Sequence, residues 1–139
     1  MWFRFIATAA LSCSFLAAQS GPQIKRTTAI ASSPASGKDM YLQYCAPCHG
    51  KGGKGDGPAA AALKVAPTDL TLLASRNQGN FPDMRISRVI DGSDSLVAHG
   101  SRDMPIWGDV FHRMDGSGPE MMKLRIANLT AYLKSIQVK

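Results

Sequence analysis

The most regular pattern of apolar positions lies near the C-terminus of the chain, over residues 117–137. Its apolar side chains are spaced by 4, 3, 4 and 3 residues, at Met122, Ile126, Leu129, Leu133 and Ile136. This spacing places them on one face of an α-helix. Ser117 and Glu120 precede them at the spacing of a capping box, which favours a helix start. The pattern therefore predicts a long C-terminal helix with one buried face.

Shorter helical patterns come earlier in the chain. Ser36 can cap a helix that runs from Gly37 into Cys45. Residues 59–65 and 83–90 predict two further short helices, each closed by a helix-breaking residue. These patterns predict helices on both sides of a loop-rich middle.

Residues 50–58 contain five glycines in nine positions, which preclude a stable helix or strand. No convincing alternation of the strand type occurs anywhere in the sequence. We therefore expect an all-α fold, a small helical domain with long loops. The apolar core of such a chain is modest, and something else usually has to fill its middle.

The first 20 residues predict a cleaved export signal. Arg4 supplies a positive start, and the apolar run from Phe5 to Ala18 is followed by small residues. This run is about 14 residues, shorter than the roughly 20 of a membrane-spanning helix, which disfavours a membrane anchor. Cys13 lies within it, but "ALSC" is a poor match to a lipoprotein cleavage site. The chain thus divides into a signal, a flexible leader without apolar periodicity, and one folded domain: residues 1–20, 21–35 and 36–139.

Charge limits the classes of partner. The chain has 16 basic and 10 acidic side chains, and loss of Arg4 with the signal lowers its formal charge from +6 to +5. The basic residues form no run, which disfavours a nucleic-acid surface. An excess of this size fits an encounter with an acidic protein partner, or simply solubility.

The densest group of chemically active residues is "CAPCH", where Cys45 and Cys48 are followed at once by His49. Such a group can serve a zinc ion, a redox-active dithiol or a covalently attached haem. Zinc wants four ligands, and after the signal only His99 and His112 could join this motif. A thioredoxin-type pair follows a β-strand, and none precedes this one. Haem attachment fits best, because one helical turn presents both thiols to the vinyl groups and turns His49 toward the iron.

Candidates for the sixth iron ligand are His99, His112 and the methionines outside the signal. Met104 is distinguished by Pro105, which fixes the chain direction, and by nearby glycines that let the loop lie flat against a ring. A thioether suits low-spin haem iron and favours its reduced state. His99 is the serious competitor, because it lies five residues away in the same loop. Other methionines are expected to fill the core: Met40, Met84, Met121 and Met122.

Four segments, "CAPCHG", "GDGP", "MPIWG" and "IANLTAYLKS", resemble in order and separation those of a class I cytochrome c of the mitochondrial and bacterial type. The resemblance covers about residues 36–139. It implies a small helical domain wrapped around one covalently attached haem c. It also implies that Gly37 in the first helix packs against Tyr132 in the last.

The resemblance extends to residues around the haem. The carbonyl oxygen of Pro58 is expected to accept the Nδ1 hydrogen of the His49 imidazole, with Pro67 as the alternative. Trp107 resembles the residue that helps to hold a haem propionate. Four arginines are either propionate contacts or surface charge, the second being the safer expectation: Arg76, Arg85, Arg88 and Arg102.

Together these features predict a protein that carries one electron at a time and is not an enzyme. Haem c is expected to be bound through Cys45 and Cys48, with His49 and Met104 as axial ligands. Both axial positions are then filled, which argues against an enzyme or a gas sensor. We expect export, to the periplasm if the source is bacterial.

The expected partners are a redox donor and a redox acceptor with an acidic docking surface. Nucleic acid and a membrane span after signal removal are not expected. Two alternatives remain. The first is an electron-entry subunit of a dehydrogenase or oxidase complex, and the second is a haem sensor or peroxidase-type protein.

Overall fold

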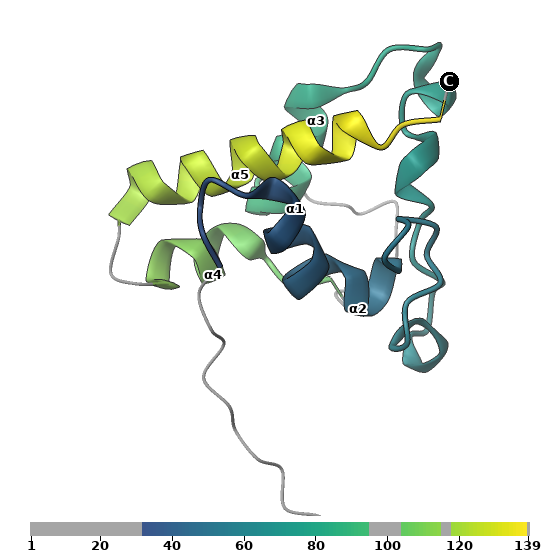
Figure 1. The fold of residues 1–139 in the computed structure, drawn as a ribbon, viewed down its shortest axis with the longest axis horizontal. Coiled ribbons are helices and arrows are strands. Elements are labelled where there is room, and N and C mark those ends of the chain that lie inside the picture. Colours follow the sequence, from purple (N-terminus) through teal and green to yellow (C-terminus); the bar gives the residue numbers. More distant parts are fainter. Residues whose placement is uncertain (1–31, 95–103, 115–117, 139) are drawn as a thin grey trace, which may run out of the picture.

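The computed structural model describes residues 32–94, 104–114 and 118–138, within which helices dominate and no strand occurs (Figure 1). The helices are α1 (Gly37–Met40), α2 (Ala46–His49), α3 (Asp83–Asp91), α4 (Trp107–Arg113) and α5 (Gly118–Ser135). A π-helical turn, η1 (Tyr41–Cys45), joins α1 to α2, and three 3₁₀ turns follow: Ala60–Ala62, Leu70–Leu72 and Ser75–Asn77. The predicted all-α fold is confirmed. In the part of the chain that the structure describes, no helix is both long and apolar enough to cross a membrane.

The stretch from α1 through η1 to α2 is continuously helical and carries the cysteine motif. Ser36 starts it, because its Oγ accepts a hydrogen bond from the Asp39 amide at 3.1 Å. Met40 and Tyr41 are fully buried on its inner side. The predicted first helix is therefore confirmed, although the π-helical widening before the motif was not foreseen.

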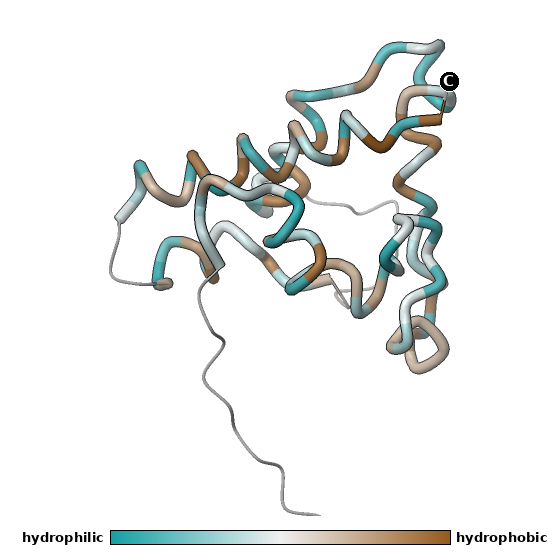
Figure 2. The backbone as a smooth tube through the Cα atoms, in the orientation of Figure 1, coloured by the Kyte–Doolittle hydropathy of each residue, from teal (hydrophilic) through white to brown (hydrophobic). Residues whose placement is uncertain are grey.

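α5 is the longest element and packs against α1, α3 and α4. Figure 2 shows apolar residues recurring turn after turn along it. Ile126, Leu129 and Leu133 are buried, and Met122 and Ile136 pack against the buried cluster, which confirms the predicted apolar face. Sequence periodicity did not indicate that Arg125 and Thr130 are buried on α5 as well.

α1 and α5 approach each other closely at Gly37. A Cβ atom at this position would collide with the main-chain oxygen of Asn128 and would lie 3.0 Å from the Cβ of Tyr132. The rings of Tyr41 and Tyr132 lie 5.2 Å apart, centroid to centroid, at the same crossing. The expected packing of Gly37 against Tyr132 is confirmed.

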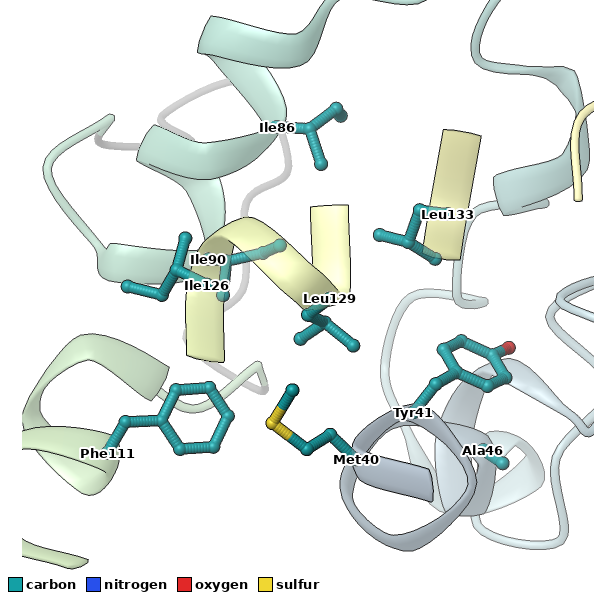
Figure 3. Close-up of a cluster of buried hydrophobic side chains, with 9 residues drawn as sticks. All are labelled: Met40, Tyr41, Ala46, Ile86, Ile90, Phe111, Ile126, Leu129 and Leu133. Atoms are coloured by element: carbon teal, nitrogen blue, oxygen red, sulfur yellow. The ribbon is translucent and has the colours of Figure 1, made fainter. Parts of the chain in front are cut away.

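The buried core joins α1, η1, α2, α3, α4 and α5, and its side chains point toward a common interior (Figure 3). Its members are Met40, Tyr41, Ala46, Ile86, Ile90, Phe111, Ile126, Leu129 and Leu133. Met84, expected to fill the core, is instead 77% exposed. It lies two residues from Ile86 on α3, and two residues along an α-helix turn a side chain to nearly the opposite face.

Two local expectations were wrong. Residues 59–65 form only the 3₁₀ turn Ala60–Ala62, which no side chain caps. A run this short cannot offset the cost of helix nucleation on propensity alone. Conversely α4 was not predicted, because the "MPIWG" stretch was interpreted as a loop. The helical spacing of Trp107 and Phe111, four residues apart, was the available signal.

The segment before α1 also packs on α5. Arg125 Nη1 donates a hydrogen bond to the Ser32 carbonyl oxygen at 2.8 Å. Asn128 Nδ2 donates to the Pro34 carbonyl oxygen, also at 2.8 Å. These bonds hold residues 32–35 against α5, and the division of the chain at Ser36 stays a prediction.

Candidate haem site

A cavity of about 380 Å³ lies beside the helical core. It is lined by Cys45, Cys48 and His49 of the "CAPCH" motif and by Met104, which sequence reasoning selected separately. Most of the other lining side chains are apolar, among them Val65, Leu70, Leu73, Ile86, Leu129 and Leu133. A largely apolar cavity of this size with a few convergent polar groups is typical of a cofactor site.

The two thiols reach the cavity because η1 and α2 are helical through the motif. Burial, assisted by the nearby Cys48, raises the pKa of the Cys45 thiol to about 12. Burial therefore disfavours a charged thiolate at Cys45 in the protein without a bound group. A thioether link to a haem vinyl group leaves the sulfur uncharged, which suits a buried position. Within residues 32–94, 104–114 and 118–138, no three His, Cys, Asp or Glu side chains gather in a metal-binding group.

His49, the last residue of α2, is oriented by a main-chain carbonyl. Its Nδ1 lies 3.1 Å from the carbonyl oxygen of Thr68. Because a carbonyl can only accept, the hydrogen resides on Nδ1, and Nε2 keeps a lone pair that can bind a metal. Burial lowers the pKa of His49, while the hydrogen bond to Thr68 opposes this effect. The ring is thus held neutral, as an axial ligand requires.

The expectation that the Pro58 carbonyl oxygen accepts the Nδ1 hydrogen of His49 was wrong. The amides of Gly57 and Ala59 donate hydrogen bonds to the carbonyl oxygens of Cys48 and Pro47, at 3.1 and 2.9 Å. Through these two hydrogen bonds the loop folds back on the end of α2. Pro58 is thereby exposed and does not line the cavity.

The alternative, Pro67, does line the cavity, but the acceptor is the carbonyl oxygen of the next residue, Thr68. The error arose because "GDGP" stands nearer to the motif. The main-chain bonds of the glycine-rich loop, which no side-chain pattern reveals, decide which carbonyl faces the imidazole.

Among the candidate sixth ligands, the structure brings Met104 to the cavity. Met104 is 37% exposed, and both it and Pro105 line the cavity ahead of α4. His112 is exposed on α4 and does not line the cavity. His99 lies outside the described residues. Binding of Met104 to iron stays a prediction.

Trp107 lines the cavity as the first residue of α4. Its ring lies 5.6 Å from that of Phe111 and 5.5 Å from that of Tyr44, and the latter two rings are 5.7 Å apart. Three rings from η1 and α4 therefore form one aromatic cluster at the cavity wall. Sequence reasoning did not identify Tyr44 or the cluster, and a propionate contact of Trp107 stays a prediction.

Two of the four arginines are exposed at the edge of the cavity. Arg76 and Arg85 are both exposed, and both line the cavity. Arg76 is also turned toward its own loop, because Nη1 donates to the Asp69 carbonyl oxygen at 3.4 Å. Arg88 is exposed and outside the lining, and Arg102 lies outside the described residues. Arg76 and Arg85 therefore lie at the cavity, and a propionate contact of either stays a prediction.

The donor set fits a c-type haem. Two thiols, one imidazole with a fixed Nδ1 hydrogen and one thioether open onto the same apolar cavity. A family model described as cytochrome C oxidase, cbb3-type, subunit III matches residues 32–117, more than half of the chain. No curated protein and no solved structure matches the chain significantly.

Proposed function

Since the chain belongs to the family of cbb3-type subunit III cytochrome c domains, we propose that it is an exported one-electron carrier with a single covalent haem c. A cytochrome c domain takes part in electron transfer through its haem. When bound, the haem supplies an iron that exchanges one electron between its ferrous and ferric states. The observation that carries the proposal is the one apolar cavity shared by Cys45, Cys48, His49 and Met104.

Each residue has a distinct task in this proposal. When a haem is present, Cys45 and Cys48 would hold it, and His49 and Met104 would bind its iron. The Thr68 carbonyl oxygen fixes the plane and the tautomer of His49. With both axial positions filled, no site remains for oxygen or peroxide, so the proposed protein transforms no substrate.

The test of the cofactor uses purified holoprotein. Oxidised and reduced absorption spectra should show one low-spin haem c. The colour should stay with the protein in acidified organic solvent, because thioether links are covalent. Carbon monoxide should not bind the reduced form. Rapid carbon monoxide binding would favour a haem sensor or peroxidase-type protein instead.

The sixth ligand is tested with paired variants. Met104→Ala should admit carbon monoxide, whereas His99→Ala should leave the weak sulfur-to-iron absorption band of the oxidised protein intact. Met104→His should lower the reduction potential by on the order of 100 mV or more, because imidazole stabilises ferric iron. If Met104→Ala changes nothing while His99→Ala abolishes native ligation, the axial pair is His/His.

A second candidate function is that of an electron-entry subunit within an oxidase or dehydrogenase complex. The name of the matching family, an oxidase subunit, is the observation that favours it. Native purification distinguishes the two functions. A free carrier elutes at the size of one small domain, whereas a subunit co-purifies with larger redox proteins in fixed proportion.

The proposed partner is a redox protein with an acidic docking face. The charge of +5 after signal removal falls to about +3 with two haem propionates, so electrostatic steering is modest. Charges at the surface are screened over about 8 Å at physiological ionic strength. Electron-transfer rates with an acidic partner should therefore fall as salt rises. Rates that do not change with salt would leave the basic excess a role in solubility alone.

A further inference from the structure

The segment that carries the Thr68 carbonyl oxygen is held in place by two remote parts of the chain. We call residues 68–74 the acceptor segment, because Thr68 accepts the hydrogen bond from His49 at 3.1 Å. On one side, the Leu70 amide donates to the Gly53 carbonyl oxygen at 2.7 Å. Within the segment, the Asp69 carboxylate accepts from the amide and hydroxyl of Thr71 at 2.8 and 2.6 Å. These bonds shape the segment locally but do not attach it to the helices.

The attachment to α5 is made by Gln137, just beyond the end of that helix. Its Oε1 accepts a hydrogen bond from the Ala74 amide at 2.9 Å. Its Nε2 donates to the carbonyl oxygens of Leu70 and Leu133, both at 2.7 Å. The next amide, that of Val138, donates to the Thr71 carbonyl oxygen at 3.0 Å. In Figure 1 the C-terminal end, marked C, accordingly lies beside the segment that follows α2.

Only an amide of this length satisfies all three partners of Gln137. The main-chain N–H of Ala74 can only donate, so it needs the side-chain oxygen of Gln137. The carbonyl oxygens of Leu70 and Leu133 can only accept, so they need the side-chain nitrogen of Gln137. A carboxylate would lose both donated bonds, and an apolar side chain would lose all three and leave main-chain groups without partners. Gln137 is therefore matched to the ends of the acceptor segment and to the last turn of α5.

We propose that Gln137 is a positioning residue for the axial ligand His49. It acts through the acceptor segment, because Leu70 and Ala74 fix the path of the chain that begins at Thr68. If the segment moves away from α5, the Nδ1 to Thr68 distance lengthens from a value already near the long end for a hydrogen bond. A weaker hydrogen bond makes the imidazole a poorer electron donor to iron, which disfavours the ferric state. This inference rests on the proposed role of His49 as a haem ligand.

The test compares Gln137→Met, which keeps the side-chain length and loses every hydrogen bond, with native holoprotein. The reduction potential of Gln137→Met should rise. In equilibrium with a fixed electron donor, the ratio of reduced to oxidised protein should therefore increase several-fold. For a one-electron couple, tenfold corresponds to 59 mV. In the ferric protein, the Nδ1 hydrogen of His49, observed by proton NMR, should exchange with solvent faster. Gln137→Asn, whose amide is one methylene shorter, should shift both readouts the same way by less.

Thr130→Val is the matched control. Thr130 Oγ1 makes a partly buried hydrogen bond of 3.2 Å with Ser87 Oγ, which links α5 to α3, and neither residue lines the cavity. Loss of this hydrogen bond should lower stability without disturbing the acceptor segment, and should leave the reduction potential and the Nδ1 exchange rate at native values. Equal shifts in both variants would show that lost stability alone changes the haem, which overturns the inference.

The remaining outcomes separate the inference from the proposed function. If the native spectra and NMR show His49 bound to iron while Gln137→Met keeps the native potential and exchange rate, the positioning role is wrong and the function stands. If the native protein shows no bound His49, the proposed function fails, and the inference fails with it.

Discussion

The helices and the loop that faces them across the cavity are held together in different ways. We call α1, η1, α2, α3, α4 and α5 the helical layer and residues 50–77 the loop wall. Every side chain of the buried hydrophobic cluster belongs to the helical layer. The loop wall contributes none of them, and its buried positions are three glycines and Thr71. It is folded instead by main-chain hydrogen bonds, such as Gly55 to His49 at 2.8 Å and Leu70 to Gly53 at 2.7 Å.

Because of this difference, we expect the haem of the proposed holoprotein to stabilise the loop wall. The apolar side chains of the loop wall, Leu63, Val65, Leu70 and Leu73, line the cavity. Leu70 and Leu73 also pack against the buried cluster, but without a bound group all four stay only partly buried or exposed, and burial is the main favourable term in folding. The helical layer is thus specified by its own side chains, whereas the loop wall needs the cofactor. Regions with few buried apolar contacts open most readily.

The largest effect is expected from removing both points of haem attachment. Cys45→Ser combined with Cys48→Ser should give an apoprotein without a cooperative thermal transition, because the remaining core is small. Hydrogen exchange should show protection lost first in residues 50–77 and retained longest in α5. A cooperative transition in this apoprotein, with a protected loop wall, would contradict the difference between the two regions.

The next effect concerns the helical layer alone. Gly37→Ala should destabilise the protein by about 3 kcal/mol, because the new methyl group meets the rigid main-chain oxygen of Asn128. The intrinsic preference of helices for Ala over Gly, about 1 kcal/mol, is too small to offset this collision. Denaturant titration of the holoprotein measures the change.

Gly52→Ala in the loop wall is the matched control for Gly37→Ala. A Cβ atom at Gly52 meets nothing within 4 Å, and the backbone there needs no positive φ. We expect no loss of stability and a gain of up to about 1 kcal/mol from a stiffer unfolded chain. A large loss at Gly52, or none at Gly37, would reverse the expected sensitivity of the two regions.

The same contrast explains what the sequence could predict. The α5 face, the capped first helix and the "CAPCH" motif are local patterns, and each was confirmed in position. The Thr68 acceptor could not be predicted, because it depends on how hydrogen bonds fold the loop wall. Pro58 was chosen instead, because the resemblance implies a proline soon after the motif as the acceptor.

The sequence pattern also did not show which charged and polar residues are buried. Arg125 is 1% exposed in α5 because its guanidinium reaches Ser32, 93 residues away, and no periodic pattern encodes such a contact. Met84 shows the converse error, since residue type suggested core and the helical phase of α3 placed it outside. Local pattern thus predicted the first helix, α3 and α5, whereas long-range contacts and helical phase decided which of their side chains are buried.

A smaller effect is expected at the junction of the two regions, where Tyr41 in η1 donates a hydrogen bond to the Gly50 carbonyl oxygen at 2.6 Å. Tyr41→Phe should cost about 1 to 2 kcal/mol, because a buried carbonyl loses its partner. Tyr132→Phe keeps the ring at the helix crossing and is the control. In the described residues the Tyr132 hydroxyl has no hydrogen bond, so this variant should be near neutral.

The pH dependence of the same residue provides a second readout. Burial, assisted by nearby Cys45 and Tyr132, raises the pKa of Tyr41 well above the usual value of 10. Above pH 10 the unfolded chain loses this proton while the folded chain keeps it, so stability falls as pH rises, by about 1.4 kcal/mol per pH unit. This part of the slope should be absent in Tyr41→Phe. An unchanged alkaline slope would show that Tyr41 ionises normally in the folded protein.

The smallest effect is expected where α3 and α5 are linked by charge. Lys134 Nζ lies 3.0 Å from the Asp83 carboxylate, with side chains 56% and 49% exposed, and 5.9 Å from the centre of the Phe81 ring. An exposed pair of this kind contributes about 0.5 kcal/mol, and salt screens it. Asp83 also faces the positive end of the α3 dipole, so a single Asp83→Asn change overstates the pair. A double-mutant cycle with Lys134→Gln and Asp83→Asn isolates the coupling.

We expect the coupling energy between Lys134 and Asp83 to be below about 1 kcal/mol and smaller in 1 M salt. A coupling above about 2 kcal/mol that persists in salt would mean that charge, and not the burial of Ile86, Ile90 and Leu133, holds α3 against α5.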